Sequence, residues 1–186
     1  MVLDRERFPR GIDDSKVLTA EAREAIYGRL RKVAVIGVGI ASVEEIDRLN
    51  IYWARMLAMV RAVDALGIDP ATVLVDGNAC PKWERPSKAI IGGDGRCRSI
   101  AAASIVAKVT RDRIMVQYDS EHPGYGWGRN KGYGTPDHRR ALADKGLTPL
   151  HRRSFAPVRL HLREHESFES QPQDVGADTG DLLNMG

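Results

Sequence analysis

The chain has 186 residues but only two cysteines, Cys80 and Cys97, and it contains no apolar run of 18 residues or more. So few cysteines are typical of a reduced cytoplasmic protein, and with no histidine nearby in sequence a zinc site is not expected. The missing apolar run argues against a transmembrane helix and a membrane partner. The first residues, MVLDRERFPRG, lack the apolar stretch of a signal peptide.

Several sequence motifs are also missing. The chain has neither GxxxxGK[ST] nor GxGxxG, which weakens the case for a glycine-rich nucleotide cradle. It has no GxSxG motif, and nothing in its Cys and His pattern supports nucleophilic catalysis.

Basic residues are absent from one end of the chain. All 28 Lys and Arg residues lie at or before Arg163, whereas the 23 residues that follow hold six acids. The part up to Arg163 has 28 basic and 19 acidic residues, a net charge of +9 that favours a polyanionic partner. We expect one folded domain over residues 1–160 and a disordered, acidic tail over 161–186.

Hydrophobic periodicity predicts an α/β domain with a mixed or largely parallel sheet. Short β-rich segments predict strands, and amphipathic or Ala-rich segments with capping residues predict helices. The strands are expected near residues 2–3 and at 33–40, 72–75 and 88–92, the helices at 20–30, 42–66, 99–117 and 135–146, and a glycine-rich loop at 123–134.

Two of the predicted strands each end in an aspartate, Asp76 and Asp94. Taken singly, each aspartate is explained by a turn, because Asp next to Gly is common after a strand. Together they predict more, since parallel strands deliver their ends to one edge of a sheet and two close carboxylates repel without a cation. We expect a divalent ion there, Mg²⁺ or Mn²⁺, which prefer oxygen ligands.

The helix predicted over 99–117 contains many small residues, which let a helix lie close against a sheet. Its basic residues Lys108, Arg111 and Arg113 are within range of a phosphate if the helix borders a nucleic acid. Asp112 lies among them, well down the helix from the strand ends, and is better explained as a salt-bridging acid than as a metal ligand.

The loop that follows alternates glycines with aromatic and basic residues: Tyr125, Trp127, Arg129, Lys131 and Tyr133. Glycine lets a backbone approach a ligand, cations meet phosphates, and flat rings stack on sugars or bases. We therefore favour nucleic acid as the partner. The alternative is a surface loop whose aromatic rings fold onto the core.

Taken together, five segments resemble the ribonuclease HII family, and the resemblance covers about residues 1–160. They are DDSKVLT at 13–19, VDGN at 75–78, the GGD and SIAAASIVAKVTRDR stretch at 92–113, HPGYGWGRNKGYGT at 122–135 and HRRSFAPV at 151–158. The resemblance implies a ribonuclease-H-like α/β fold, a mixed five-stranded sheet flanked by helices with a helical C-terminal part. It implies an endonuclease that cleaves the RNA strand of RNA–DNA hybrids and nicks 5′ to ribonucleotides embedded in duplex DNA.

The resemblance also implies roles for individual residues. Asp76 and Asp94 match the third and fourth of four family acids, which are catalytic and hold two divalent ions, Mn²⁺ or Mg²⁺. Lys16 matches a basic residue near the hybrid backbone, and Tyr133 a tyrosine that packs on the deoxyribose of an RNA-to-DNA junction. With Arg129 and Lys131 for phosphates, these form the expected nucleic-acid-binding set of a monomer.

One family motif is absent from this sequence. The family opens with an Asp-Glu-Ala-Gly-Arg-Gly-type segment on its first strand, which supplies two acids and recognises the 2′-hydroxyl, whereas this chain begins Met1-Val2-Leu3-Asp4. We expect about 20 residues and the first strand to be missing, through a misassigned start or a truncated gene. A hybrid-binding remnant impaired in cleavage is therefore the alternative function, and an unrelated nucleotide-binding α/β protein is a third.

Overall fold

The computed structural model describes residues 1–4 and 6–169. Short strands and longer helices alternate, as expected for an α/β chain. In order they are β1 (Val2–Leu3), α1 (Ala20–Val33), β2 (Ala34–Val35), α2 (Val43–Asp64), β3 (Val73–Asp76), β4 (Ser87–Ile90), α3 (Gly93–Arg96), α4 (Arg98–Glu121), α5 (Trp127–Asn130), α6 (Pro136–Lys145) and α7 (Ala156–Glu169).

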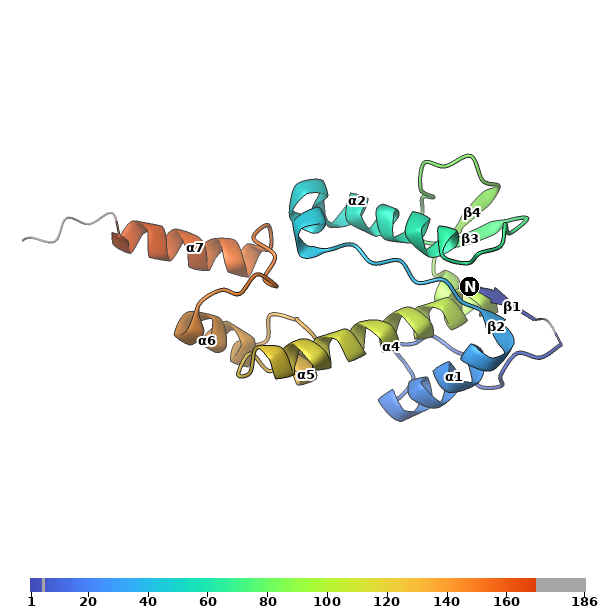
Figure 1. Ribbon diagram of the computed structural model, residues 1–186, viewed down its shortest axis with the longest axis horizontal. Helices are drawn as coiled ribbons and strands as arrows, with labels where there is room; N and C mark the ends of the chain where they lie inside the picture. The colour runs from blue at the N-terminus through green and yellow to red at the C-terminus, as the bar shows by residue number, and fades with distance from the viewer. Residues whose placement is uncertain (5, 170–186) are drawn as a thin grey trace, which may run out of the picture.

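The long helix α4 crosses the molecule and connects its two ends (Figure 1). Near its start it packs against α1, and near its end it packs against α5. Two of its small residues, Ala101 and Ala102, are buried at 3% and 0% exposure, whereas Ala107 is exposed. Both α1 and β3 pack against this helix. One core cluster comprises Ile26, Leu30, Ala102, Ile105, Val106 and Val109, and the other comprises Met115, Tyr125, Trp127 and Ala141.

Polar caps fix where α1 and α2 begin, as the sequence predicts. The Thr19 hydroxyl accepts a hydrogen bond from Ala22 N at 3.2 Å, and Ser42 and Glu45 form a capping box at the start of α2. Inside α2, Asn50 has φ of 65° and breaks the helical geometry. Its side-chain oxygen accepts from Tyr52 N at 2.9 Å, so the second segment of α2 begins with a cap of its own.

Within the described residues the strands form two separate pairs, β1 antiparallel to β2 and β3 parallel to β4. The parallel β3–β4 pair agrees with the prediction, whereas the expected single five-stranded sheet is not formed by this part of the chain. The strand predicted over 33–40 was wrong beyond Val35. Four apolar residues of these open strands and the segment after β2 are 39% to 55% exposed: Val35, Val38, Ile40 and Leu74.

The segment after β2 lies against α2 instead of joining a strand. A Cβ atom placed on Gly37 would fall 2.1 Å from the Ala62 carbonyl oxygen, and one on Gly39 would fall 2.0 Å from that of Ala58. Only glycine fits so close to a helix backbone. The glycines that look like part of a buried strand in the sequence therefore serve helix packing.

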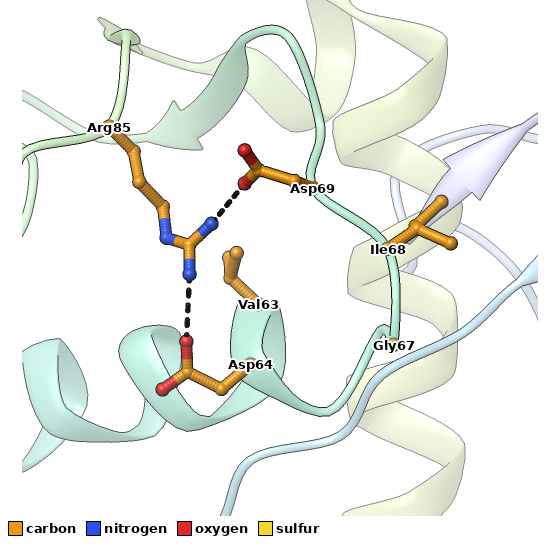
Figure 2. A pocket seen from close by; sticks show the side chains of 6 residues that line it. All are labelled: Val63, Asp64, Gly67, Ile68, Asp69 and Arg85. Carbon is orange, nitrogen blue, oxygen red and sulfur yellow. Dashed lines mark hydrogen bonds and ion pairs between the residues drawn. The ribbon is translucent and has the colours of Figure 1, made fainter.

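An arginine fastens the end of α2 to the loops around β3 and β4. Arg85 reaches between Asp64 and Asp69 and forms ion pairs with both, at 3.2 Å to Asp64 (Figure 2). With Val63, Gly67 and Ile68 these side chains line an open hollow of about 360 Å³. Because the aspartates are already paired with Arg85, we assign the hollow a structural role.

The C-terminal part differs from expectation at two places. The loop predicted over 123–134 includes the short helix α5, and α7 continues past the predicted domain boundary at residue 160. Val158, in the first turn of α7 and within the predicted domain, is buried. The rest of the predicted tail, residues 170–186, lies outside the described residues. No helix within residues 1–4 and 6–169 is long and apolar enough to cross a membrane.

Two glycine substitutions test the packing of the segment after β2. Gly39→Ala should lower the free energy of unfolding by about 1–3 kcal/mol, because the new methyl group collides with the backbone of α2. Gly28→Ala is the matched control: Gly28 lies in α1 with open space around it, so alanine should be neutral or add up to about 1 kcal/mol. Urea unfolding measures both, and equal midpoints for the two variants would contradict the close contact.

Candidate active site

Asp76, the last residue of β3, is held by the chain that follows β4. Its Oδ1 atom accepts a hydrogen bond from the Gly93 N–H at 2.8 Å. Gly93 is buried, and a Cβ atom there would lie 2.5 Å from Ile100 Cδ1 and 3.3 Å from Asp76 Oδ1. The Asp76 carboxylate thus contacts Gly93, the residue directly before Asp94. A turn after β3 would not by itself explain this contact.

Asp94 is in α3 and not at the end of β4, where the sequence predicted it. β4 ends at Ile90, and Gly92 then takes a left-handed conformation with φ of 63° that starts α3. The Asp94 side chain is 13% exposed, and its Oδ2 accepts from Lys16 Nζ at 2.9 Å. The structure therefore brings Lys16 into contact with Asp94 and holds Asp76 on the residue before it. The sequence predicted that the two aspartates lie close together, but it did not predict the contact between Lys16 and Asp94.

The contact between Lys16 and Asp94 alters the acidity of both groups. The hydrogen bond from Lys16 lowers the pKa of the Asp94 carboxyl below its ordinary value. In turn the hydrogen bond to Asp94, and then the charge of Asp14, raise the pKa of Lys16. Asp94 is accordingly ionised and Lys16 protonated at neutral pH. The Lys16 side chain is 78% exposed, so the pair contributes little to stability.

Asp76 and Asp94 offer the hard oxygen ligands that Mg²⁺ and Mn²⁺ prefer. Among the described residues there is no group of three or more His, Cys, Asp or Glu side chains arranged to hold a metal ion. Two carboxylates fit a single ion, because Mg²⁺ is commonly bound by one or two carboxylates and completed by water and substrate phosphate. They do not by themselves fit a four-acid, two-ion centre.

A basic cleft of about 490 Å³ lies between α1, α4 and α5. Five basic and two acidic side chains line it, an excess of three positive charges. The basic residues are Arg23, Lys108, Arg113, Arg129 and Lys131, and the acids are Glu24 and Asp112. The sequence predicted Arg129 and Lys131 as phosphate contacts, and the structure places both in one cleft.

Ion pairs explain the acids of the cleft. Lys108 Nζ lies 2.7 Å from Asp112 Oδ1, so Asp112 is salt-bridged as expected.

Arg23 was not singled out from the sequence, where it is one more arginine in an amphipathic helix. Its guanidinium donates to the carbonyls of Ser15 at 2.8 Å and Leu18 at 2.6 Å, on either side of Lys16. The cleft therefore adjoins the backbone turn that presents Lys16 to Asp94.

The aromatic residues of the 123–134 loop divide into two groups. Tyr125 and Trp127 are 6% and 2% exposed and stack on each other, so these two rings fold onto the core, as in the alternative explanation of the loop. Tyr133 is 68% exposed. Arg111 donates to the Lys131 carbonyl at 3.0 Å and so fastens the loop to α4 near Tyr133.

Comparison with known proteins identifies a family for this chain. The family model described as Ribonuclease HII matches residues 5–158. A protein named Ribonuclease HII from Rhizorhabdus wittichii is 68% identical over 158 residues, which are 85% of this chain and 78% of that protein. Another from Paracoccus denitrificans is 55% identical over 168 residues, or 90% and 80% of the two chains.

A solved structure shares the fold. The ribonuclease H2 from Pyrococcus horikoshii OT3 superposes with a TM-score of 0.75 at 25% identity, over 91% of this chain and 89% of that one. The α/β architecture is therefore ribonuclease-H-like, as the sequence predicted, even though the strands described here form two pairs. The family match and the identities together show that this chain belongs to the ribonuclease HII family of ribonuclease H hydrolases.

Proposed function

We propose that this protein is an endonuclease that cleaves the RNA strand of RNA–DNA hybrids and nicks 5′ to ribonucleotides embedded in duplex DNA. The supporting observation is the meeting of Asp76, Asp94 and Lys16 at one site beside a basic cleft. Acids that bind a divalent ion and cations that bind phosphates are the two components that phosphodiester hydrolysis needs. The proposed site of action is the cytoplasm, the proposed form a monomer, and the proposed task the removal of ribonucleotides from DNA.

In this proposal each residue acts on one part of the substrate. Asp76 and Asp94 would hold Mg²⁺ or Mn²⁺, which when bound activates water and stabilises the charge of the leaving oxygen. Lys16 holds Asp94 in its ionised form and places a positive charge where the scissile phosphate arrives. The products are a 5′-phosphate and a 3′-hydroxyl.

The other residues position the nucleic acid. Arg129 and Lys131 neutralise backbone phosphates in the cleft, which sets affinity and orientation without selecting a sequence. The exposed Tyr133 ring packs on the deoxyribose at the RNA-to-DNA junction. Selection of RNA depends on the 2′-hydroxyl, the group that distinguishes RNA from DNA.

Hybrid binding with impaired cleavage is the second candidate function. It is favoured by the two acids at this site and by the lack of a cluster of three or more candidate ligands in the part of the chain that the structure describes. The two candidates differ in turnover and share the same binding surface. A cleavage assay beside a binding assay on one labelled hybrid separates them.

Asp76→Asn tests the acid pair. The variant keeps an oxygen that can accept from Gly93 N but loses the charge that binds the cation, so cleavage of a duplex with one embedded ribonucleotide should fall about 100-fold or more. Gel analysis of the labelled strand in Mn²⁺ and in Mg²⁺ measures the rate. Asp69→Asn, an acid paired with Arg85 away from the site, is the control and should cleave normally. Undiminished cleavage by Asp76→Asn would remove Asp76 from the mechanism.

The double variant Arg129→Gln/Lys131→Gln tests the basic cleft. Affinity for duplexes should fall alike for all sequences, and the slope of log affinity against log salt should shrink by about 1 for each phosphate that the variant no longer neutralises. Fluorescence anisotropy at several salt concentrations gives the slope. Arg31→Gln/Lys32→Gln, at the exposed end of α1, removes the same charge elsewhere. Equal slopes for the two double variants would contradict a specific role for the cleft.

Substitution of Tyr133 tests junction packing. Tyr133→Ala should weaken the preference for a ribonucleotide-containing duplex over an all-DNA duplex by about fivefold or more, since ring stacking is worth roughly 1–3 kcal/mol. Tyr133→Phe retains the ring and should retain the preference. Competition binding with the two duplexes measures the ratio, and a ratio unchanged by alanine would assign the ring no part in recognition.

A further inference from the structure

Tyr133 combines an exposed ring with a backbone that is held on both sides. Its N–H donates to the Asn130 carbonyl at 2.9 Å, and its own carbonyl accepts from the Thr135 N–H at 2.8 Å. The neighbouring Gly132 has φ of 79°, which permits the turn. A third contact is the one between the Tyr133 carbonyl and His138 Nδ1, at 2.9 Å. The backbone therefore determines where the ring points.

Hydrogen-bond chemistry fixes the tautomer of His138. The indole N–H of Trp127 can only donate, and it lies 3.1 Å from His138 Nε2. His138 Nε2 must therefore accept, which leaves the single proton of the neutral ring on Nδ1. That proton is the one directed at the Tyr133 carbonyl.

The same argument determines the tautomer of the His151 ring. The Thr148 N–H donates to His151 Nδ1 at 3.0 Å, so the proton of this ring is on Nε2. That Nε2 lies 3.3 Å from His138 Nε2, the atom that also accepts from Trp127. The N–H groups of Trp127 and His151 thus share the one lone pair of His138 Nε2, and the Nδ1–H of His138 donates to the Tyr133 carbonyl.

These hydrogen bonds are enclosed by packed rings. His151 is 7% exposed, and its ring centroid lies 5.1 Å from that of Tyr125 and 5.2 Å from that of Trp127. Burial, reinforced by the proximity of His138, lowers the pKa of His151 to about 4, so this ring is neutral at physiological pH. His138 is therefore held by hydrogen bonds to its two ring nitrogens.

We propose that His138 and His151 are positioning residues that set the direction of the Tyr133 ring through the Tyr133 carbonyl. The inference rests on the role proposed above for Tyr133 and identifies what presents that ring to the duplex. His138 forms the direct contact, and His151 adds a second donor beside Trp127 to the Nε2 atom of His138.

The proposal requires His138 Nε2 to accept. A proton on that atom would set an N–H against the N–H groups of Trp127 and His151, with no acceptor among them. The donor to the Tyr133 carbonyl is therefore the Nδ1–H group of His138.

Imidazole ¹⁵N NMR of the full chain tests these hydrogen bonds without nucleic acid. At pH 7.5 we expect the proton of His138 on Nδ1 and that of His151 on Nε2, with signals assigned by His138→Asn and His151→Asn. In His138→Leu the Thr135 amide, which donates to the same Tyr133 carbonyl, should shift. A proton on His138 Nε2, or an unmoved Thr135 amide, would overturn the proposal.

Binding of paired duplexes tests the consequence for recognition. His138→Leu removes the donor to the Tyr133 carbonyl and should lose most of the preference that Tyr133→Ala loses, whereas His138→Asn restores a donor near the Nδ1 position and should recover it. His138→Leu should add nothing to Tyr133→Ala. Tyr125→Phe is the matched control, because it removes a 2.9 Å hydrogen bond to the Gly146 carbonyl in the same cluster that involves neither histidine.

The outcomes separate the two claims. Equal losses in His138→Leu and Tyr125→Phe would mean general loosening of the cluster and would overturn the positioning role. If Tyr133→Ala leaves the preference unchanged, the recognition role of Tyr133 fails. The NMR result then still decides whether the two histidines fix the Tyr133 carbonyl.

Discussion

The hydrogen bond from the Gly93 amide to the Asp76 carboxylate is the interaction on which the site depends. It joins the end of β3 to the start of α3, and because Gly93 precedes Asp94 it also sets where the second acid lies. A methyl group at position 93 would force the end of the Ile100 side chain to move. Lys16 then completes the group from a loop more distant in sequence, and its charge offsets the repulsion between two carboxylates.

Helix α4 links this site to the rest of the proposed duplex-binding surface without any sheet between them. α3 and Asp94 lie at its beginning, the basic cleft borders its middle, and Arg111, in the same stretch of the helix, fastens the Tyr133 loop. A single helix of 24 residues is stiff enough to keep such groups at fixed distances. The arrangement explains why the two pairs of strands do not need to form one sheet for these residues to be placed.

The acids and the helices could be predicted from the sequence because their signals are local. Two carboxylates after parallel strands, the Thr19 cap and the Ser42 capping box all follow from short-range rules. Prediction failed where the deciding contact is distant in sequence. Gly37 and Gly39 look like strand residues until α2 is seen beside them, and Trp127 alternates with glycine just as Tyr133 does although only Trp127 is buried. Arg23 carries no sequence signal, because its hydrogen bonds go to carbonyl oxygens and its ion-pair partner, Asp112, is distant in sequence.

The two core clusters share no residue, and α4 passes through both. Structural units that are joined mainly by one helix can open separately, each with its own free energy. The unit formed by α5, α6 and the end of α4 can therefore exchange its amide hydrogens while the Asp76 and Asp94 end stays closed. A ligand long enough to touch both units would couple them and slow that exchange throughout, so hydrogen exchange could map the footprint of a duplex even where no bond is cut.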